Sequence, residues 1–585
     1  MPEEIPRNRR VAIPIAIIFA LLFYGVYRWR HLNSFTGTLV GIAFAVVAAL
    51  TYALVSYAGE GSKLYGWKPI AVYLPSVRRP EGHVHFKKKF LWTVFILILY
   101  FVLTNIYIWG IDKSRITDVF EQFRAILAGA SGSIVHLGIG PIVTAGIIME
   151  LFVGAKIVNI DITKDEDRIL FHAIQKLMIV FMILIEGIPQ VFGYLSPDGK
   201  VVAMLGEALG GHGLFWARTV IVAQLVIGSY LLYLMDEVVS KWGIGSGISL
   251  FIAAGVSQSI ITGLVNWVPV RPGEPLSLSN PPSGVIPKTI YLASHMSASD
   301  LAAGGLERIL IAPPNSVFAL ISTIFIFFLV AYLEGAKIEL PLAHEYAGGI
   351  KAGYPLKLMY VSVIPVILTS ALLANVQMWA LLFWTNPTLS KIPILGRNPI
   401  IGVFPTAVEA QRMGISQTTP IGGIAYYLST PRGIHQWLLP LIDPDRYSVY
   451  LMGHTVGQML LHIVAYSAFM MGMSVLFGLF WVETANMGPS ALAEQLVAQG
   501  LRIPRIRADK RSIERFLKRY IPPLTLFSSL AIGGLAVVAT LLGTIGRTSG
   551  TGLLLLVSIM MQFYEALGRE ELMEMHPVLR SFVGG

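Results

Sequence analysis

One carboxylate stands out among the residues that could do chemistry, because Glu186 lies deep in the apolar run Leu177–Val191. An ionisable group inside a membrane-spanning segment is costly and usually functional. Thr144 and Asn375 place polar side chains in two other apolar runs. The three residues either form one polar cluster, or each Thr and Asn satisfies a nearby backbone group. Spacing along the chain leaves both interpretations open.

A second polar set, His454, Gln458 and His462, recurs at helical spacing and suggests a metal site or a proton path. The two histidines would lie about 12 Å apart along a helix, whereas zinc ligands lie about 2 Å from a single ion. A shared metal ion is therefore excluded, and we expect a hydrated helix face.

Nucleotide and thiol chemistry have no support in the sequence. Gly243, Gly245 and Gly247 follow an apolar run rather than a strand, so they do not form a dinucleotide-binding loop. The chain contains neither a GxxxxGK[ST] motif nor a cysteine. We therefore predict no enzymatic activity, no catalytic residue, no metal and no cofactor, and any driving energy must come from elsewhere.

The composition defines the class of protein. Hydrophobic residues make up 55% of the 585 positions and charged residues only 13%. A membrane-spanning helix needs about 20 apolar residues, so we predict a multi-pass membrane protein of the all-α class. The ten expected core spans are Phe90–Trp109, Ile142–Gly154, Ile169–Tyr194, Phe215–Met235, Gly247–Val265, Val317–Leu333, Leu358–Trp384, Tyr450–Val482, Pro523–Thr544 and Leu553–Leu567.

The N-terminal region precedes these core spans. The apolar run Val11–Tyr27 resembles a signal peptide, but arginines follow it where small cleavage-site residues would be expected. With Leu39–Tyr57 it is better explained as an extra transmembrane hairpin within residues 1–63. Residues 64–89 are basic and interrupted by prolines, which predicts an amphipathic segment on the cytoplasmic membrane surface.

The stretch Gly138–Leu151 contains a predicted helix break, because Gly138, Gly140 and Pro141 precede a new apolar helix. Backbone groups freed by a break at membrane depth must be buried in protein or line a water-filled path. The sequence therefore predicts a cavity at this point.

The connection Asn486–Tyr520 is the most basic in the chain. Its eight cationic residues are Arg502, Arg505, Arg507, Lys510, Arg511, Arg515, Lys518 and Arg519. Positive residues mark cytoplasmic loops, but topological anchoring needs fewer of them. Clustered Arg and Lys also bind phosphate, so an additional acidic partner such as RNA is favoured.

Six motifs in order resemble the SecY family of protein-conducting channels in its archaeal form. They are Gly138–Leu151, Asp236–Gln258, Ile364–Gln377, Gly423–Pro431, Phe480–Thr484 and Leu517–Thr525, and the resemblance covers about Leu74 to the C-terminus. It implies a clamshell of ten helices in two inverted halves, residues 90–313 and 314–585. Residues 121–134 correspond to the family's plug, a short half-helix that seals the external side.

The resemblance also implies site residues. An aliphatic pore ring would consist of Ile139, Val143, Ile248, Ile252, Ile367 and Leu555. Thr144, Glu186 and Asn375 match a polar cluster at the lateral gate, and Arg505 and Arg507 lie in the loop that the family presents to the ribosome. One departure concerns residues 335–345, where the family's usual arginine run is missing ahead of Leu340-Pro341-Leu342.

We therefore expect a channel subunit in the cell membrane that passes nascent secretory polypeptides across the membrane and releases apolar segments sideways into the lipid bilayer. Small SecE/gamma-type and beta-type translocase subunits, the ribosome and the signal recognition particle receptor are the implied partners. The alternatives are an ion-coupled secondary transporter using Glu186 and the helix break, and a non-transporting insertase scaffold. A transporter site would be polar at its constriction, whereas the matched ring is aliphatic.

Overall fold

The computed structural model describes residues 74–82, 84–112, 123–154, 165–193, 195–271, 273–344, 351–386, 389–392, 394–413, 415–431, 433–498, 501–502, 509–546 and 549–575. The predicted N-terminal hairpin, the first two residues of the predicted plug, and Arg505 and Arg507 lie outside these ranges.

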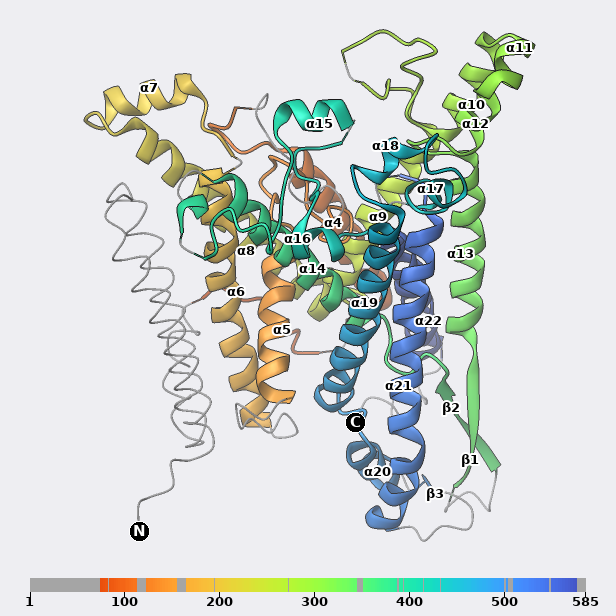
Figure 1. The fold of residues 1–585 in the computed structure, drawn as a ribbon. Helices are drawn as coiled ribbons and strands as arrows, with labels where there is room; N and C mark the ends of the chain where they lie inside the picture. Colours follow the sequence, from red (N-terminus) through yellow and green to blue (C-terminus); the bar gives the residue numbers. More distant parts are fainter. Residues whose placement is uncertain are drawn as a thin grey trace, which may run out of the picture.

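Each of the ten predicted core spans contains a helix (Figure 1). They are α4 (Phe86–Asn105), α5 (Gly140–Gly154), α6 (Asp165–Gly193), α8 (Gly213–Trp242), α9 (Gly247–Val265), α13 (Val317–Gly335), α14 (Ile364–Thr385), α19 (Val456–Thr484), α21 (Lys510–Leu542) and α22 (Gly550–Met575). Within the described residues, eight helices are long and apolar enough to cross a membrane, namely α6, α8, α9, α13, α14, α19, α21 and α22. The helix α5 is apolar but shorter.

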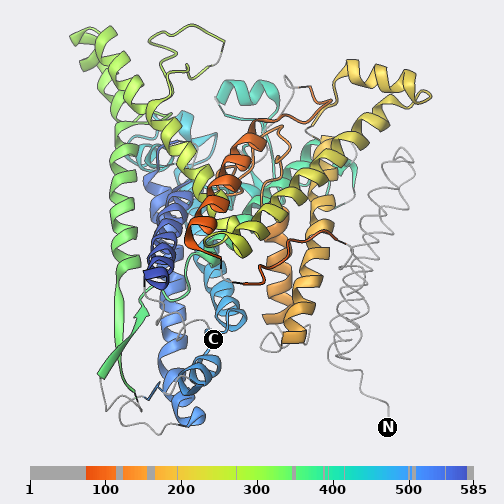
Figure 2. The same cartoon turned by 180° about the vertical axis from the view of Figure 1, so that it is seen from behind.

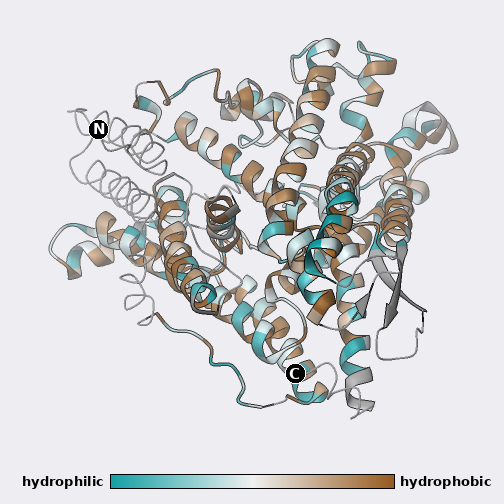
Figure 3. Ribbon diagram, turned by 90° about the horizontal axis from the view of Figure 1, so that it is seen from below, coloured by the Kyte–Doolittle hydropathy of each residue, from teal (hydrophilic) through white to brown (hydrophobic). Residues whose placement is uncertain are grey.

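The outer faces of these helices are apolar. On α13, Ile321, Phe325 and Phe328 are more than half exposed, and Phe95 and Ile98 are similarly exposed on α4. Figure 3 shows hydrophobic residues on the outside of the bundle as well as between its helices. A soluble monomer rarely exposes such contiguous apolar surface, so these faces are suited to lipid.

Shorter elements cover the two ends of the bundle. The upper end in Figure 1 carries α7 (Gly199–Ala208), α10 (Val285–His295), α11 (Ala298–Asp300), α12 (Leu306–Leu310), α15 (Ala407–Met413), α17 (Leu438–Ile442) and α18 (Ser448–Leu451). The lower end carries α20 (Pro489–Ala498) and three strands. The described residues of the basic connection 486–520 therefore lie at the end opposite to the described residues of the connections 262–314 and 385–447.

A three-stranded sheet adds to the expected helical fold, outside the spans. Strands β1 (Lys337–His344) and β2 (Lys351–Lys357) pair antiparallel, with Lys337 opposite Lys357. The edge strand β3 (Leu501–Arg502) pairs with the end of β1. The stretch Leu340-Pro341-Leu342 thus lies in a strand beside the basic connection 486–520, and the hairpin extends below α13 (Figure 1).

Two pairs of core-span helices pack against each other, α5 with α6 and α14 with α19. The helices α5 and α6 lie side by side, and both contact α14, while α5 also contacts α19. On the opposite face, seen in Figure 2, α4 packs against α8 and α9. The helix α5 begins at Gly140, two residues before the predicted start at Ile142, so the expected break between the preceding segment and this helix is present.

Candidate functional site

The six predicted ring residues gather in one apolar cluster. Ile139, Val143, Ile252, Ile367 and Leu555 are buried members of a single hydrophobic core, and Ile248 packs against it half-buried. They come from α9, α14, α22 and the start of α5, which are distant in sequence. The structure therefore brings this set together with aliphatic side chains as its lining.

The described part of the predicted plug, residues 123–134, packs into the same core. Phe123, Ile126 and Leu127 are buried members of the cluster that holds the ring. This part of the plug consists of hydrogen-bonded turns rather than the expected half-helix. The Ile139 amide donates to the Leu127 carbonyl at 2.7 Å, which joins plug and ring through the backbone.

Two glycines allow the backbone to pass close to the plug. Gly138 has a φ of +59°, and a Cβ atom at this position would lie 2.1 Å from the Leu127 carbonyl oxygen. A Cβ atom on Gly228 of α8 would lie 2.1 Å from the Ile134 carbonyl oxygen. Real atoms cannot approach so closely, so both contacts depend on glycine.

A chain of polar groups also anchors the plug. Arg124 donates through Nη1 to the His136 carbonyl at 2.7 Å. The Gly132 amide donates to Nδ1 of buried His136 at 2.9 Å, so the ring proton is on Nε2, which lies 2.9 Å from Oε1 of Gln190. Gln190 in turn contacts the sulfur of Met378 on α14 at 3.5 Å.

His136 and Gln190 were not predicted from the sequence. A signal for Gln190 was available, because it follows Glu186 by four residues and so lies on the same helix face. His136 gave no comparable signal, since its partners come from a turn and from a distant helix.

The three predicted gate residues form one connected group. Oγ1 of Thr144 lies 2.9 Å from Oε1 of Glu186, whose side chain is buried. Asn375 donates through Nδ2 to the same Thr144 oxygen at 2.9 Å. Thr144 is on α5, Glu186 on α6 and Asn375 on α14, so the contacts cross between the two helix pairs. Oγ1 of Thr144 also lies 2.8 Å from the Gly140 carbonyl, so the alternative local partner is present as well.

The expected hydrated face around His454, Gln458 and His462 is wrong for His462. This side chain is buried, and its Nε2 lies 2.8 Å from the Ser429 carbonyl. His454 stacks on Tyr426, and Gln458 completes the capping box that starts α19. The stripe therefore packs against the connection that precedes α19. Among the described residues, no cluster of His, Cys, Asp or Glu side chains could hold a metal ion.

Comparison with known proteins identifies the class of protein. The SecY family model matches residues 133–564, and the model for the plug domain of Sec61p matches residues 98–132. The protein translocase subunit SecY of Archaeoglobus fulgidus is 40% identical over 519 residues, which covers 88% of this chain and 98% of the relative. The corresponding subunit of Halobacterium salinarum is 39% identical over 532 residues, covering 89% of this chain and 99% of the relative.

Solved structures agree with this class. The structure described as "a protein conducting channel" superposes with a TM-score of 0.65 at 35% identity, covering 87% of this chain and 98% of the other. Canine Sec61 in a ribosome-channel complex superposes with a TM-score of 0.63 at 34% identity, covering 87% and 98%. The fold and the match to the plug-domain model are thus those of a protein-conducting channel. The chain belongs to the SecY family.

This membership decides between the functions that the sequence left open. The chain is the pore subunit of a protein translocation channel in the membrane, and it is not an enzyme. An ion-coupled secondary transporter has no support. The apolar core that the predicted ring residues share agrees with this conclusion, because a transporter would place polar groups at its constriction.

Proposed function

We propose that the chain works as a clamshell of ten helices in two inverted halves, with the first half running from α4 to α9 and the second from α13 to α22. In this arrangement α5 and α6 face α14 and α19 across the lateral gate. The packing of α5 and α6 against α14, and of α5 against α19, supports this assignment. Inverted repeats with a pathway between them recur in membrane transport proteins.

The bonded chain Asn375–Thr144–Glu186 carries this proposal. It is a polar contact between the two halves at a place otherwise lined by apolar helices, and it acts as the latch of the closed gate. One hydrogen bond typically contributes about 0.5–1.5 kcal/mol net. A latch of this strength holds the gate closed at rest yet opens when a sufficiently apolar segment can partition into lipid.

An insertion assay with test helices of graded hydrophobicity measures the latch. Replacing Thr144, Glu186 and Asn375 by Val, Leu and Leu removes the polar contact, so a less apolar segment is expected to enter the bilayer. Thr144→Ser retains the hydroxyl and serves as the matched control with an unchanged threshold. If the triple variant keeps the parent threshold, the three residues are separate local polar groups.

The ring and the plug act as the seal of the resting channel. A constriction lined by branched aliphatic side chains gives water and ions no hydrogen-bonding partner, as in hydrophobic gates. The plug residues Ile126 and Leu127 share the core of the ring, so sealing is divided between the two. A solved SecY structure, in which the plug domain is described as stabilising the closed state and maintaining a membrane seal, superposes with a TM-score of 0.63 at 35% identity.

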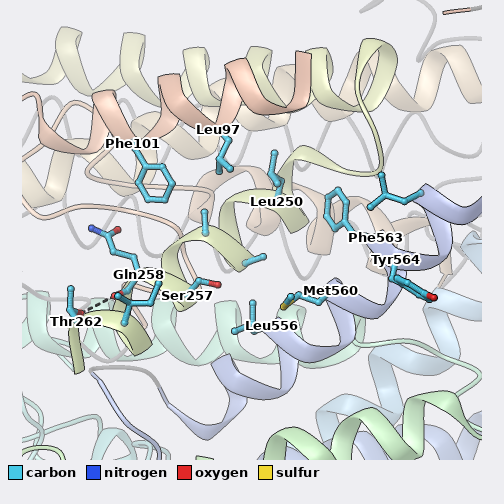
Figure 4. A pocket seen from close by; sticks show the side chains of 14 residues that line it. Leu97, Phe101, Leu250, Ser257, Gln258, Thr262, Leu556, Met560, Phe563 and Tyr564 are labelled. Atoms are coloured by element: carbon cyan, nitrogen blue, oxygen red, sulfur yellow. Dashed lines mark hydrogen bonds between the residues drawn. The ribbon is translucent and has the colours of Figure 1, made fainter. Parts of the chain in front are cut away.

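A small SecE/gamma-type subunit fits the groove on the face opposite the gate. This groove has a volume of about 700 Å³ and lies between α4, α9 and α22. Figure 4 shows Leu97, Phe101, Leu250, Phe563 and other mainly apolar side chains around it. A single membrane helix would cover this lining and hold the two halves together from behind. A beta-type subunit and the signal recognition particle receptor are further partners expected from the family.

The ribosome is the proposed partner of the lower end, since solved relatives include ribosome-bound channels. Arg505 and Arg507 follow β3 in the sequence and precede α21, and β3 itself pairs with β1 of the β1–β2 hairpin. Replacing both with Glu is expected to weaken ribosome binding and to lower its tolerance of salt, because phosphate contacts release counterions. Lys391→Glu with Arg397→Glu is the control at the opposite end. Unchanged binding of the loop variant in a salt titration would remove this loop from the interface.

A further inference from the structure

A second cavity, distant from the ring and the gate, lies at the upper end of the molecule. Its volume is about 170 Å³, room for roughly six water molecules at about 30 Å³ each. It is formed where the connection after α9 meets α10 and α12. Three basic residues line it, namely Arg271, Lys288 and Arg308. No acidic side chain is among the described residues of the lining.

Lys288 supplies a buried ammonium group to this cavity. Its side chain is only 3% exposed, and Nζ donates to the carbonyls of Ala312 at 2.7 Å and Pro314 at 3.0 Å. A lysine has three N–H donors, so one remains for a ligand. Burial and the neighbouring Arg308 guanidinium lower the pKa of Lys288 to about 8.

The two arginines lie at the exposed mouth of the cavity. Arg271 is fixed by the buried Asn280, which accepts from the Arg271 amide at 2.8 Å and donates to its carbonyl at 3.2 Å. The nearby acids do not neutralise the site. Glu274 lies 4.0 Å from Arg271 with both side chains exposed, and an exposed pair of this kind is weak. Glu307, next to Arg308, is bonded to Arg446 and Tyr447.

The surroundings of the cavity are apolar and exposed. Val270 and Leu278 line its mouth, and Trp267, Ile290 and Leu306 are exposed on the elements that form it. Tryptophan is enriched where a membrane meets water. A cationic cavity ringed by exposed apolar side chains matches the two parts of a phospholipid, since the charged headgroup enters the cavity and the acyl chains follow the apolar rim.

We propose that this cavity binds the phosphate headgroup of an anionic phospholipid, with Lys288 at its floor and Arg271 and Arg308 at its mouth. The bound lipid would attach the connection between the two halves of the channel to the bilayer surface. The cavity is separate from the seal and the latch, so the proposal stands independently of the roles given to those residues.

A fluorescence titration of the full chain with its small subunits tests the proposal. The chain has no cysteine, so Leu276→Cys provides a single site for an environment-sensitive dye beside the cavity. The protein in detergent is titrated with phosphatidylglycerol, with phosphatidylcholine or with inorganic phosphate. We expect a saturable response to phosphatidylglycerol at concentrations at least fivefold below any response to phosphatidylcholine. A dye at Ile442→Cys, exposed at the same end, should not respond in this way.

Charge-removing variants identify the residues involved. Arg271→Gln with Arg308→Gln changes only exposed side chains, so the fold should be retained, and we expect the midpoint for phosphatidylglycerol to rise roughly tenfold. Lys391→Gln with Arg397→Gln removes two exposed charges elsewhere at the same end and should leave the midpoint unchanged. Lys288→Met should abolish the saturable response.

Two results would overturn the proposal. An arginine-pair variant that binds phosphatidylglycerol like the parent would show that the lipid does not occupy this cavity. An equal response to inorganic phosphate at matched concentration would show a site for free anions rather than for a lipid.

Discussion

The proposed seal and the proposed latch lie a few residues apart in α5 and the residue before it, but one consists of apolar contacts and the other of hydrogen bonds. Ile139 and Val143 join a close-packed aliphatic core with the plug, whereas Thr144 makes hydrogen bonds to α6 and α14. Apolar packing is non-directional and grows with buried area, at about 0.8 kcal/mol per CH₂ group. A hydrogen bond is directional and contributes about 1 kcal/mol. If these roles are correct, we expect the seal to adapt its shape around a passing chain and the latch to have two discrete states.

This contrast supports the proposal that one region excludes ions and that the other sets the hydrophobicity threshold for entry into lipid. Aliphatic side chains exclude water regardless of their detailed arrangement, so several small contacts share the task. A threshold needs a defined free-energy difference between two states, which a few specific bonds provide. Changes in the seal should accordingly alter conductance, and changes in the latch should alter the choice of segments that enter lipid.

The largest effect is expected from making the ring polar. Replacing Ile139, Ile248 and Ile367 by Ser offers hydroxyls to water at the constriction without adding bulk. We expect resting ion conductance in planar bilayers, and more when residues 121–134 are also deleted, with translocation retained. The matched control places Ser at Ile98, Ile227 and Ile324, which face outward and are exposed.

This experiment tests whether the predicted ring residues form the constriction. If the triple ring variant without a plug remains as tight as its parent, these residues do not form the constriction. An equally large ion leak from the outward-facing control variant would also refute the ring assignment, because the leak would then follow from general loosening of the helices.

The next largest effect is expected at Gly138, which determines how closely the plug approaches α5. Gly138→Ala places a methyl group in a left-handed backbone conformation, which costs about 1–3 kcal/mol, and against the Leu127 carbonyl as well. The plug should be displaced, so we expect more frequent resting openings. Gly472→Ala is the control, because nothing lies within 4 Å of that position. Equal opening frequencies in the two variants would contradict the role of Gly138.

Features that are determined within one segment of the chain could be predicted from the sequence, whereas contacts between distant segments could not. The ten core helices follow from apolar runs, which are set within one segment. Ile139 with Val143, and Ile248 with Ile252, are spaced four apart on their helices, so a shared direction was predictable. That the two pairs meet in one core was expected only from the family resemblance, because no pattern within a segment specifies its distant neighbour.

Other features depend on contacts that the sequence does not reveal. The approach of Gly228 to Ile134 and the bond from His136 to Gln190 join residues far apart in the chain. For His462 the prediction was wrong, because the polar stripe predicted a hydrated helix face. The connection that precedes α19 folds back and buries the His462 side chain instead. No strand was predicted at Leu340-Pro341-Leu342, because the pairing of β1 with β2 and β3 joins separate segments of the chain.

A smaller effect is expected from His136, which anchors the plug through side-chain bonds. His136→Phe keeps an aromatic ring but leaves the Gly132 amide and the Gln190 carbonyl oxygen without this partner. An unsatisfied buried polar group costs about 1–3 kcal/mol, part of which relaxation of the turn should recover. With Ala128→Cys as the single thiol in the chain, we expect faster labelling by a water-soluble reagent in the His136→Phe background. Equal labelling rates would show that the plug is held by apolar packing alone.

The smallest effect is the coupling between Thr144 and Asn375 across the gate. Thr144→Val and Asn375→Leu each remove one partner of the same 2.9 Å bond. Once either partner is lost, losing the other should matter less, so the double variant should shift the insertion threshold by less than the sum of the single shifts. The difference should be about 0.5–1.5 kcal/mol in the double-mutant cycle. Pairing Thr144→Val with Ser294→Ala, an exposed residue of α10 outside the four gate helices, should give additive shifts. Additivity for Thr144 and Asn375 too would mean that their bond does not stabilise the closed state, and the latch would then reduce to the contact of Thr144 with Glu186 on the same half.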